Sequence, residues 1–270
     1  MILEALQALR VGAGRRARRM GFLTECVGIW ARQRRHGAAW ADHQARSKAV
    51  ILAALPPPPR RRALVFGAAL VLDVPLAELA DAFDEVVLID LMFLPATRRA
   101  AKRLGNVTLC VHDVSESLTG IEAGRPRVAA PARFHDDPAV DLVVSANLLS
   151  QLPIVPNAYL AREFAWDEAA CAALGRELVA AHLAYLGGFR CSVVLISDVE
   201  RLIEDRDGRE IARFSALFDM PLEWPGEEWL WPVAPFGEID RNHRVTHRVR
   251  ACRPSPTRVD KIGSRQPSQS

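Results

Sequence analysis

Short apolar segments alternate with helical segments between residues 63 and 196, and no other feature of the sequence constrains the fold as strongly. The apolar segments are rich in valine, leucine and isoleucine, and they are too short to be buried helices. Because they do not alternate with polar residues, each predicts a strand that is buried on both faces. The five predicted strands are 63–66, 85–89, 107–111, 141–145 and 189–196.

Segments with helical periodicity separate these strands, and a loop-like segment spans 119–138. Asp167 is expected as an anion at the first turn of the longest helix, and Gly187–Gly188 is expected to stop it. Strands that alternate with helices form a parallel sheet with helices on both faces. The helices are predicted at 76–83, 96–104 and 167–186, and two later strands that could pair antiparallel at 229–233 and 245–251.

The chain before the first strand has a different pattern. Residues 22–55 have apolar residues at helical spacing, with a possible break at Gly37. Pro56–Pro59 ends this region, because four prolines supply no backbone donors and favour extended geometry. We therefore expect an N-terminal basic helical region with a proline spacer over 1–59, one domain over 60–252, and a disordered tail over 253–270.

Charge is unevenly distributed along the chain. Residues 1–62 carry a net charge of +10, residues 63–252 carry −10, and residues 253–270 carry +3. We favour the interpretation that the basic region is a helical layer docked on the acidic body. Contact with nucleic acid is the alternative, but no nucleic-acid motif accompanies the basic residues. The arginines concerned are Arg15, Arg16, Arg18, Arg19, Arg32, Arg34 and Arg35.

Composition excludes several classes of protein. Half of the residues are apolar and a quarter are charged, which excludes a wholly disordered chain and a collagen-like fibre. The five cysteines are scattered without a CxxC pair, so we expect reduced thiols, no disulfide scaffold and no metal site. We find no signal-peptide pattern and no apolar run of the ~20 residues that span a bilayer, and we expect a cytoplasmic protein.

The residues that follow the strands are the ones to inspect, because ligands bind beyond the carboxyl ends of the strands in such sheets. A small-residue turn, Gly67-Ala68-Ala69, follows the first strand. Asp90 closes the second strand and can accept hydrogen bonds from ribose hydroxyls, and Asp113 after the third can accept one from an adenine amino group. A polar segment, 145–151, follows the fourth strand. An aspartate at such a position is more commonly a turn residue or a helix cap, so the joint pattern carries the inference.

This pattern resembles the class I S-adenosylmethionine-dependent methyltransferases, over roughly residues 63–200. The segments ALVFGAALVLDVPLAELADAFDEVVLID, VTLCVHDV and DLVVSANLLSQLP carry the resemblance. It implies a Rossmann-like, seven-stranded, mostly parallel sheet with helices on both faces, closed by an antiparallel hairpin, behind the N-terminal helical extension. The glycine loop is degenerate, since Gly67 is followed by two alanines and Val65 stands where the family carries an acid.

The resemblance also implies roles for residues at the strand ends. Gly67 to Ala69 would lie under the methionine part of S-adenosylmethionine, and Asp73 could hold its amino group. Asp90 would bind the ribose, Asp113 with Val114 would hold the adenine, and Asn147 and its neighbours would lie near the methyl group. The candidate cofactor residues are thus Gly67, Ala68, Ala69, Asp73, Asp90, Asp113, Val114 and Ser145.

A dinucleotide-binding protein is the competing α/β interpretation. The distance from Gly67 to Asp90 suits it, but the GxGxxG fingerprint is absent and Asp73 would repel a pyrophosphate. S-adenosylmethionine carries a cationic amine and a sulfonium and no phosphate, so carboxylates favour it over a dinucleotide.

Methyl transfer from a sulfonium depends on proximity and alignment, so no catalytic base need be evident in the sequence. Asn147 and Gln151 are the candidate catalytic residues, as positioning groups, with His112 or His182 as possible bases. We expect a small-molecule acceptor. An RNA methyltransferase that uses the basic region is one alternative, and a non-catalytic binding or scaffolding protein is another. Trp224, Trp229 and Trp231 are expected in the core or a lid, or as an aromatic wall for the acceptor.

Overall fold

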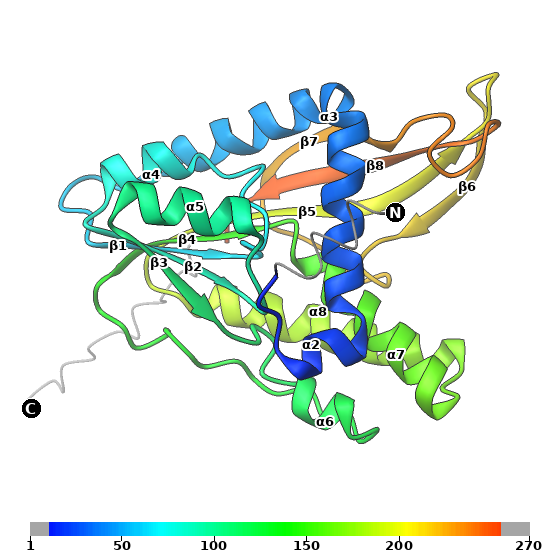
Figure 1. The fold of residues 1–270 in the computed structure, drawn as a ribbon, viewed down its shortest axis with the longest axis horizontal. Helices are drawn as coiled ribbons and strands as arrows, with labels where there is room; N and C mark the ends of the chain where they lie inside the picture. Colours follow the sequence, from blue (N-terminus) through cyan, green and yellow to red (C-terminus); the bar gives the residue numbers. More distant parts are fainter. Residues whose placement is uncertain (1–10, 255–270) are drawn as a thin grey trace, which may run out of the picture.

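An eight-stranded sheet forms the centre of the fold (Figure 1). The structure is a computed structural model that describes residues 11–254, so nearly all of the predicted disordered tail lies outside the described residues. The strand order is β3-β2-β1-β4-β5-β8-β7, with β6 beside β5. The strands are β1 (Arg62–Phe66), β2 (Glu85–Asp90), β3 (Val107–Val111), β4 (Val140–Ala146), β5 (Ser192–Glu204), β6 (Glu210–Ser215), β7 (Gly226–Ala234) and β8 (Arg244–Cys252).

The pairing of the strands confirms the predicted mixed sheet. Strands β1 to β5 pair in parallel, whereas β8 is antiparallel to both β5 and β7. The seven predicted strands are present, and β6 is an eighth strand that the sequence analysis missed. Strand β5 begins at Ser192 rather than residue 189, and it runs on to Glu204 because β8 and β6 pair with its second half.

Helices cover both faces of the sheet (Figure 1). Helices α3, α4 and α5 lie on one face, and α8 and α7 lie on the other. Four of the helices were not predicted, namely α2, α6, η1 and α7, and α6 overlaps the expected loop 119–138. The helices are α2 (Arg15–Met20), α3 (Phe22–Leu52), α4 (Leu76–Ala82), α5 (Pro95–Leu104), α6 (Leu118–Glu122), the 3-10 helix η1 (Leu149–Gln151), α7 (Ile154–Phe164) and α8 (Glu168–Gly187).

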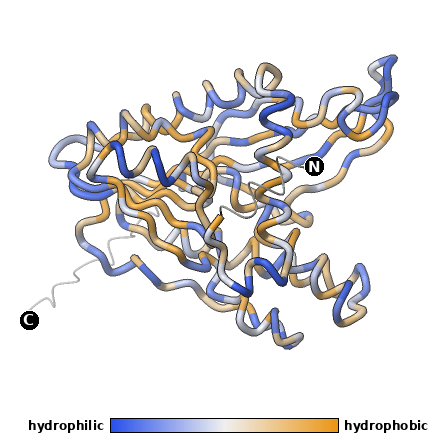
Figure 2. Tube along the Cα trace, viewed as in Figure 1, coloured by the Kyte–Doolittle hydropathy of each residue, from blue (hydrophilic) through white to orange (hydrophobic). Residues whose placement is uncertain are grey.

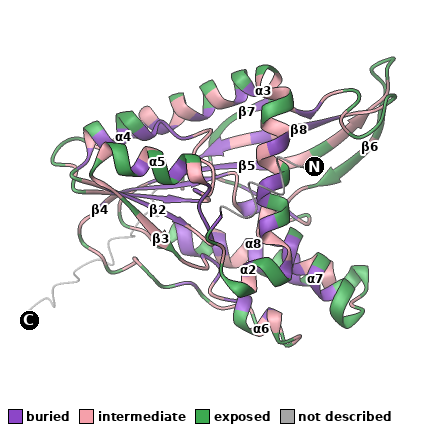
Figure 3. Ribbon diagram, viewed as in Figure 1, coloured by how far each residue is buried: buried purple, intermediate pink, exposed green. Residues whose placement is uncertain are grey.

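Burial on both faces explains the continuous apolar strands. In β1, Ala63 and Val65 face the core cluster shared with α3 and α4, while Leu64 and Phe66 face the cluster shared with α8. Figure 2 shows the resulting apolar centre, and Figure 3 shows buried strands beneath largely exposed outer helix faces. Successive side chains of a strand point to opposite faces, so a strand covered twice needs apolar residues at every position.

Helix α3 packs on the sheet through its second half. Trp40 is 2% exposed, and its indole N–H donates to the Val233 carbonyl of β7 at 3.2 Å. The helix deviates from helical geometry at His36, next to the break expected at Gly37. The second half of α3 therefore shares the core of the sheet.

Ion pairs attach the basic helices to the body, as the docked-layer interpretation expects. Arg16 and Arg19 pair with Glu122, at 2.7 and 3.6 Å. Further along, Arg32 and Arg35 both pair with Glu238, at 3.2 and 2.6 Å. These contacts hold the pKa of Glu238 low, at about 2, chiefly through Arg35.

Helix α8 is the long helix that the sequence predicted over 167–186. Among the described residues it is the one helix that is long and apolar enough to span a membrane by length and composition, although no such stretch was expected. Arg176 and Glu177 interrupt its apolar run, which hid it from a search for an uninterrupted segment. Its buried face packs under the sheet through Val179, Tyr185 and Leu186, and the side chain of Asp167 caps its start by accepting from the Ala170 N–H at 2.8 Å.

Candidate functional site

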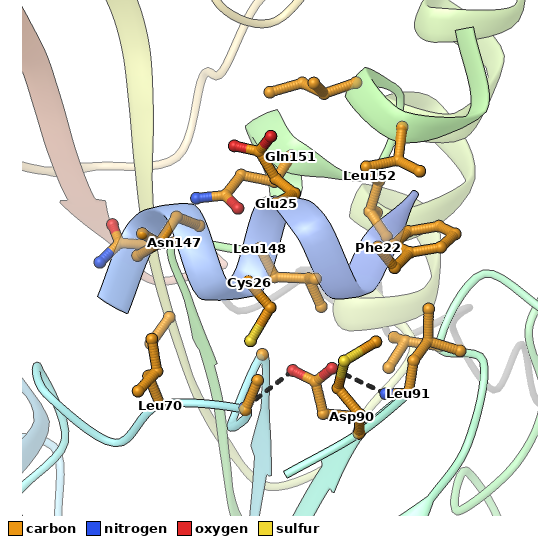
Figure 4. A pocket seen from close by; sticks show the side chains of 18 of the residues that line it. Phe22, Glu25, Cys26, Leu70, Asp90, Leu91, Asn147, Leu148, Gln151 and Leu152 are labelled. Carbon is orange, nitrogen blue, oxygen red and sulfur yellow. Dashed lines mark hydrogen bonds between the residues drawn. The ribbon is translucent and has the colours of Figure 1, made fainter. Parts of the chain in front are cut away.

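A pocket lies beyond the carboxyl ends of β1, β2, β3 and β4, and α3 crosses over it (Figure 4). The loops after these strands form its floor, and the first turns of α3 with η1 and α7 form the opposite wall. It occupies the sheet edge at which the sequence predicted a ligand. The polar residues that line it are Glu25, Asp73, Asp90, His112, Asp113, Ser115, Asn147 and Gln151.

Most of the predicted site residues come together here, although their roles remain predictions. Ala68 is fully buried beneath the loop and does not line the pocket. Ser145 is also fully buried and does not line the pocket. Its hydroxyl lies 2.9 Å from Nε2 of His182, a residue of α8. The predicted residues that line the pocket are Gly67, Ala69, Asp73, Asp90, Asp113, Val114, Asn147 and Gln151.

Gly67 allows the loop after β1 to lie against the end of β4. Its φ of +81° is in the left-handed region, and a Cβ built there would lie 2.8 Å from the Ala146 carbonyl oxygen. Its N–H donates to the Ile89 carbonyl of β2 at 3.1 Å. Only glycine fits this conformation and this approach together.

Asp90 links the first loop to the end of β2. One carboxylate oxygen accepts the Ala69 N–H at 2.9 Å, and the other accepts the Leu91 N–H at 2.7 Å. Burial raises the pKa of Asp90 to about 6, against these backbone hydrogen bonds, which lower it. Each oxygen retains acceptor capacity toward the pocket that Asp90 lines.

Asp113 organises the next turn. One of its oxygens accepts from both the N–H and the hydroxyl of Ser115, at 3.0 and 2.7 Å, and the other accepts from the Leu118 N–H at 2.9 Å. Asp113 therefore fixes the start of α6, the capping role that an aspartate after a strand commonly has. It does so at the rim of the pocket.

A buried polar cluster at the inner end of the pocket contains a residue that the sequence analysis missed. Asn147, at φ 52°, donates through Nδ2 to Asp73 Oδ2 at 2.8 Å. His43 of α3 lies beside both, with its Nε2 3.2 Å from Asn147 Nδ2 and 3.7 Å from Asp73 Oδ1. The N-terminal helix thus supplies a side chain to the same cluster as the loops after β1 and β4.

The contacts of His43 fix its tautomer. The indole N–H of Trp229 donates to His43 Nδ1 at 3.1 Å, and an indole nitrogen is a donor only. In the neutral ring the proton is therefore on Nε2, the nitrogen that faces Asp73. The ring also stacks on Trp231, with centroids 4.0 Å apart and planes at 5°. Trp40 and His43 lie three residues apart on one buried helix face, a spacing that could have marked His43.

The two candidate bases differ in position. His112 lines the pocket, and burial together with nearby Arg133 lowers its pKa. His182 is 1% exposed in α8 and lies outside the pocket, and burial lowers its pKa to about 3. Of these two histidines, only His112 can face a ligand here.

The buried His182 predicts an acid-sensitive fold. Its folded pKa of about 3 lies below its ordinary value of 6.5, so the unfolded chain binds the extra proton between these values and stability is lost as pH falls through that range. The variant His182→Gln can keep the hydrogen bond to Ser145. Between pH 6.5 and 4.5 its free energy of unfolding should fall by about 2 to 3 kcal/mol less than that of the unaltered protein. Urea unfolding at both pH values measures the difference, and equal losses in the two proteins would contradict the assignment.

The charged side chains that line the pocket are acidic. Four carboxylates line the pocket, from Glu25, Asp73, Asp90 and Asp113, and none of the described lining residues is lysine or arginine. The structure describes no group of three or more histidine, cysteine or acidic side chains placed to hold a metal within residues 11–254. The arrangement favours an organic cation over a phosphate.

No protein-family model matches the chain, and no curated protein matches it either. A solved structure that matches is Burkholderia thailandensis 1,6-didemethyltoxoflavin-N1-methyltransferase with bound 1,6-didemethyltoxoflavin and S-adenosylhomocysteine, at 16% identity and a TM-score of 0.39, over 85% of this chain and 87% of that chain. Another is Haemonchus contortus phosphoethanolamine N-methyltransferase 1 with phosphoethanolamine and S-adenosylhomocysteine, at 13% identity and a TM-score of 0.35, over 84% of this chain and 45% of that chain. The DhpI-SAM-HEP complex matches at 14% identity and a TM-score of 0.34, over 82% of this chain and 93% of that chain.

The topology of the sheet identifies the fold without reference to these matches. Strands β1 to β5 are parallel in the order β3-β2-β1-β4-β5, and antiparallel β8 and β7 complete the sheet. The pocket lies where the strand order reverses, between β1 and β4, as in other doubly wound sheets. The chain therefore has a Rossmann-like α/β fold with a mostly parallel sheet.

Proposed function

We propose that the protein transfers a methyl group from S-adenosylmethionine to a small-molecule acceptor. The observation that carries the proposal is the pocket at the switch point of the sheet, which is lined by four carboxylates and by no described lysine or arginine. S-adenosylmethionine carries a sulfonium and an ammonium, and opposite charges within a few ångströms favour the charged form of each partner.

The residues at the pocket fit this cofactor better than they fit a dinucleotide. A pyrophosphate needs backbone N–H groups at a glycine-rich helix start or basic side chains. Here the loop after β1 carries Asp73, and helix α4 begins only at Leu76. An unpartnered buried acceptor, Asn147 Oδ1, also lies in a residue that lines the pocket. Both features favour a ligand that brings positive charge and hydrogen-bond donors.

Each candidate residue would have a distinct task with the cofactor bound. Asp90 would accept from the ribose hydroxyls, Val114 would pack against the adenine, and Asp73 would bind the cationic amino group. Asn147 donates to Asp73 and holds it in place, and the Nε2–H of His43 faces Asp73, with Nε2 3.7 Å from Oδ1. Bound S-adenosylmethionine supplies an activated methyl group: the acceptor lone pair forms the new bond to carbon, the electron pair of the broken bond stays on sulfur, and the acceptor proton leaves to water or a base.

The walls of the pocket favour a small acceptor. Helix α3 crosses the pocket, and η1 and α7 flank it, so the space is bounded by side chains on several sides. Arginines of the basic N-terminal helices are engaged with acids of the body, among them Arg16 with Glu122 and Arg35 with Glu238. Both features support a small-molecule acceptor over RNA.

Binding of S-adenosylhomocysteine by isothermal calorimetry tests the proposal. We expect binding at pH 7.5 that weakens at least tenfold in Asp90→Ala, because one carboxylate that accepts from hydroxyls is worth about 1.5 to 3 kcal/mol. Asp136→Ala is the matched control, since Asp136 lies outside this pocket, and it should bind normally. Folded protein that binds neither S-adenosylhomocysteine nor S-adenosylmethionine would refute the proposed function.

The raised pKa of Asp90 adds a pH dependence to this binding. Asp90 gains a proton as pH falls through about 6, and the neutral acid attracts the cationic cofactor less. We expect the affinity for S-adenosylmethionine to fall between pH 7.5 and 5 in the unaltered protein and to change much less in Asp90→Asn. A pH profile that is the same in both proteins would assign the dependence to another group.

A further inference from the structure

One wall of the pocket is apolar apart from two side chains. This wall comes from the first turns of α3, from η1 and from the start of α7. Figure 4 shows Glu25 and Gln151 together on one side of α3, while Cys26 points from α3 toward Asp90. The apolar residues of the wall are Phe22, Ile29, Leu152, Ile154 and Val155.

Glu25 differs from the other acids of the pocket. Asp90 and Asp113 accept hydrogen bonds from the chain's own backbone, and Asp73 accepts one from Asn147. Glu25 is exposed in the first turn of α3, and its carboxylate makes no hydrogen bond or ion pair with any residue in the described range 11–254. It is therefore the pocket acid, among those described, that is left available for a ligand.

We propose that the methyl acceptor is an amine on an apolar body, bound as its ammonium ion by Glu25. This inference rests on the proposed methyl transfer and specifies its substrate class. The apolar side chains of the wall suit the body of such a molecule, and a carboxylate forms charge-assisted hydrogen bonds with an ammonium group. A carboxylate or phosphate acceptor would meet acids and, among the described lining residues, no counter-charge.

The same carboxylate suits the chemistry that an ammonium requires. The nitrogen must first lose one proton, and Glu25 can accept it and pass it to water at the exposed rim. The freed lone pair then forms the N–C bond, while the electrons of the broken S–C bond stay on sulfur. The products are the methylated amine, S-adenosylhomocysteine and one proton, so no further reactant is needed.

Calorimetry with three isosteric probes tests the inference. Protein saturated with S-adenosylhomocysteine is titrated with benzylamine, benzyl alcohol and benzoate at pH 7.5. We expect benzylamine to bind about tenfold more tightly than benzyl alcohol, and benzoate to bind most weakly. Glu25→Gln should reduce benzylamine binding to the level of the alcohol and leave benzyl alcohol unchanged.

Glu168→Gln is the matched control, because Glu168 is also an exposed acid in the first turn of a helix and lies outside the pocket. It removes the same favourable helix-dipole interaction and should preserve the amine preference. If the unaltered protein shows no amine preference, or keeps it in Glu25→Gln, the amine inference is overturned. Because every titration begins with S-adenosylhomocysteine, failure at that first step identifies the proposed function as the part that is wrong.

Discussion

Gly67→Ala is expected to lower the free energy of unfolding by about 3 kcal/mol and to weaken the binding of S-adenosylhomocysteine at least tenfold. Two costs combine at this position. The φ of +81° is strained for any residue with a Cβ, by about 1 to 2 kcal/mol. The new Cβ would also lie 2.8 Å from the Ala146 carbonyl oxygen, which is backbone and cannot rotate away. Urea unfolding and calorimetry measure the two effects.

Gly105→Ala separates the two costs. Gly105 has nearly the same φ, +79°, but a Cβ there would meet nothing within 4 Å. We therefore expect it to lose only about 1 to 2 kcal/mol, the cost of the backbone conformation, and to leave ligand binding unchanged. If the two variants are equally stable, the close approach of the loop after β1 to the end of β4 has no energetic importance.

The parallel strands could be predicted from the sequence because a strand that is buried on both faces is a continuous apolar segment. In β1, Leu64 and Val65 point to opposite cores, and both must be apolar. The spacing of apolar residues predicted the strands of this part of the sheet and the helices between them. It also predicted that β7 and β8 could pair antiparallel. The position of the ligand site could then be predicted, because the carboxyl ends of parallel strands lie at the same edge of the sheet.

Strand β6 and helix α7 left no such signal in the sequence. Strand β6 is mostly exposed and reads as a polar segment, and it is a strand because it pairs with the extension of β5 beyond Ser197. Helix α7 contains Pro156 near its start, where the first-turn N–H groups have no helical partner to lose, so a proline is tolerated there.

Some residues of the candidate site could be predicted from the sequence, and others could not. Asp90 and Asn147 follow strands, so their meeting at one edge could be predicted from topology. Glu25 and His43 come from a helix that precedes the sheet, and only the packing of α3 brings them to the pocket. Separating the basic N-terminal region from the body at the sequence level therefore concealed Glu25, which lines the pocket, and His43, which lies beside Asn147 and Asp73.

The docking of α3 makes Trp40 the second position with a large expected effect. Trp40 is 2% exposed, meets Trp231 edge-on with centroids 4.9 Å apart, and donates to the Val233 carbonyl. Trp40→Ala would leave a cavity and an unpartnered carbonyl, so we expect it to lower the free energy of unfolding by about 4 kcal/mol. Urea unfolding measures this loss.

Trp30→Ala is the matched control on the same helix. Trp30 is only half-buried and stacks with the Arg34 guanidinium, 5.1 Å from its ring centroid, so its removal should cost about 1 kcal/mol. Because α3 covers the pocket, Trp40→Ala should also weaken S-adenosylhomocysteine binding and expose the N-terminal helix to limited proteolysis before the rest of the chain. Equal stability, binding and proteolysis in the two variants would mean that α3 is not held by the core of the sheet, and the roles assigned to Glu25 and His43 would lose their structural basis.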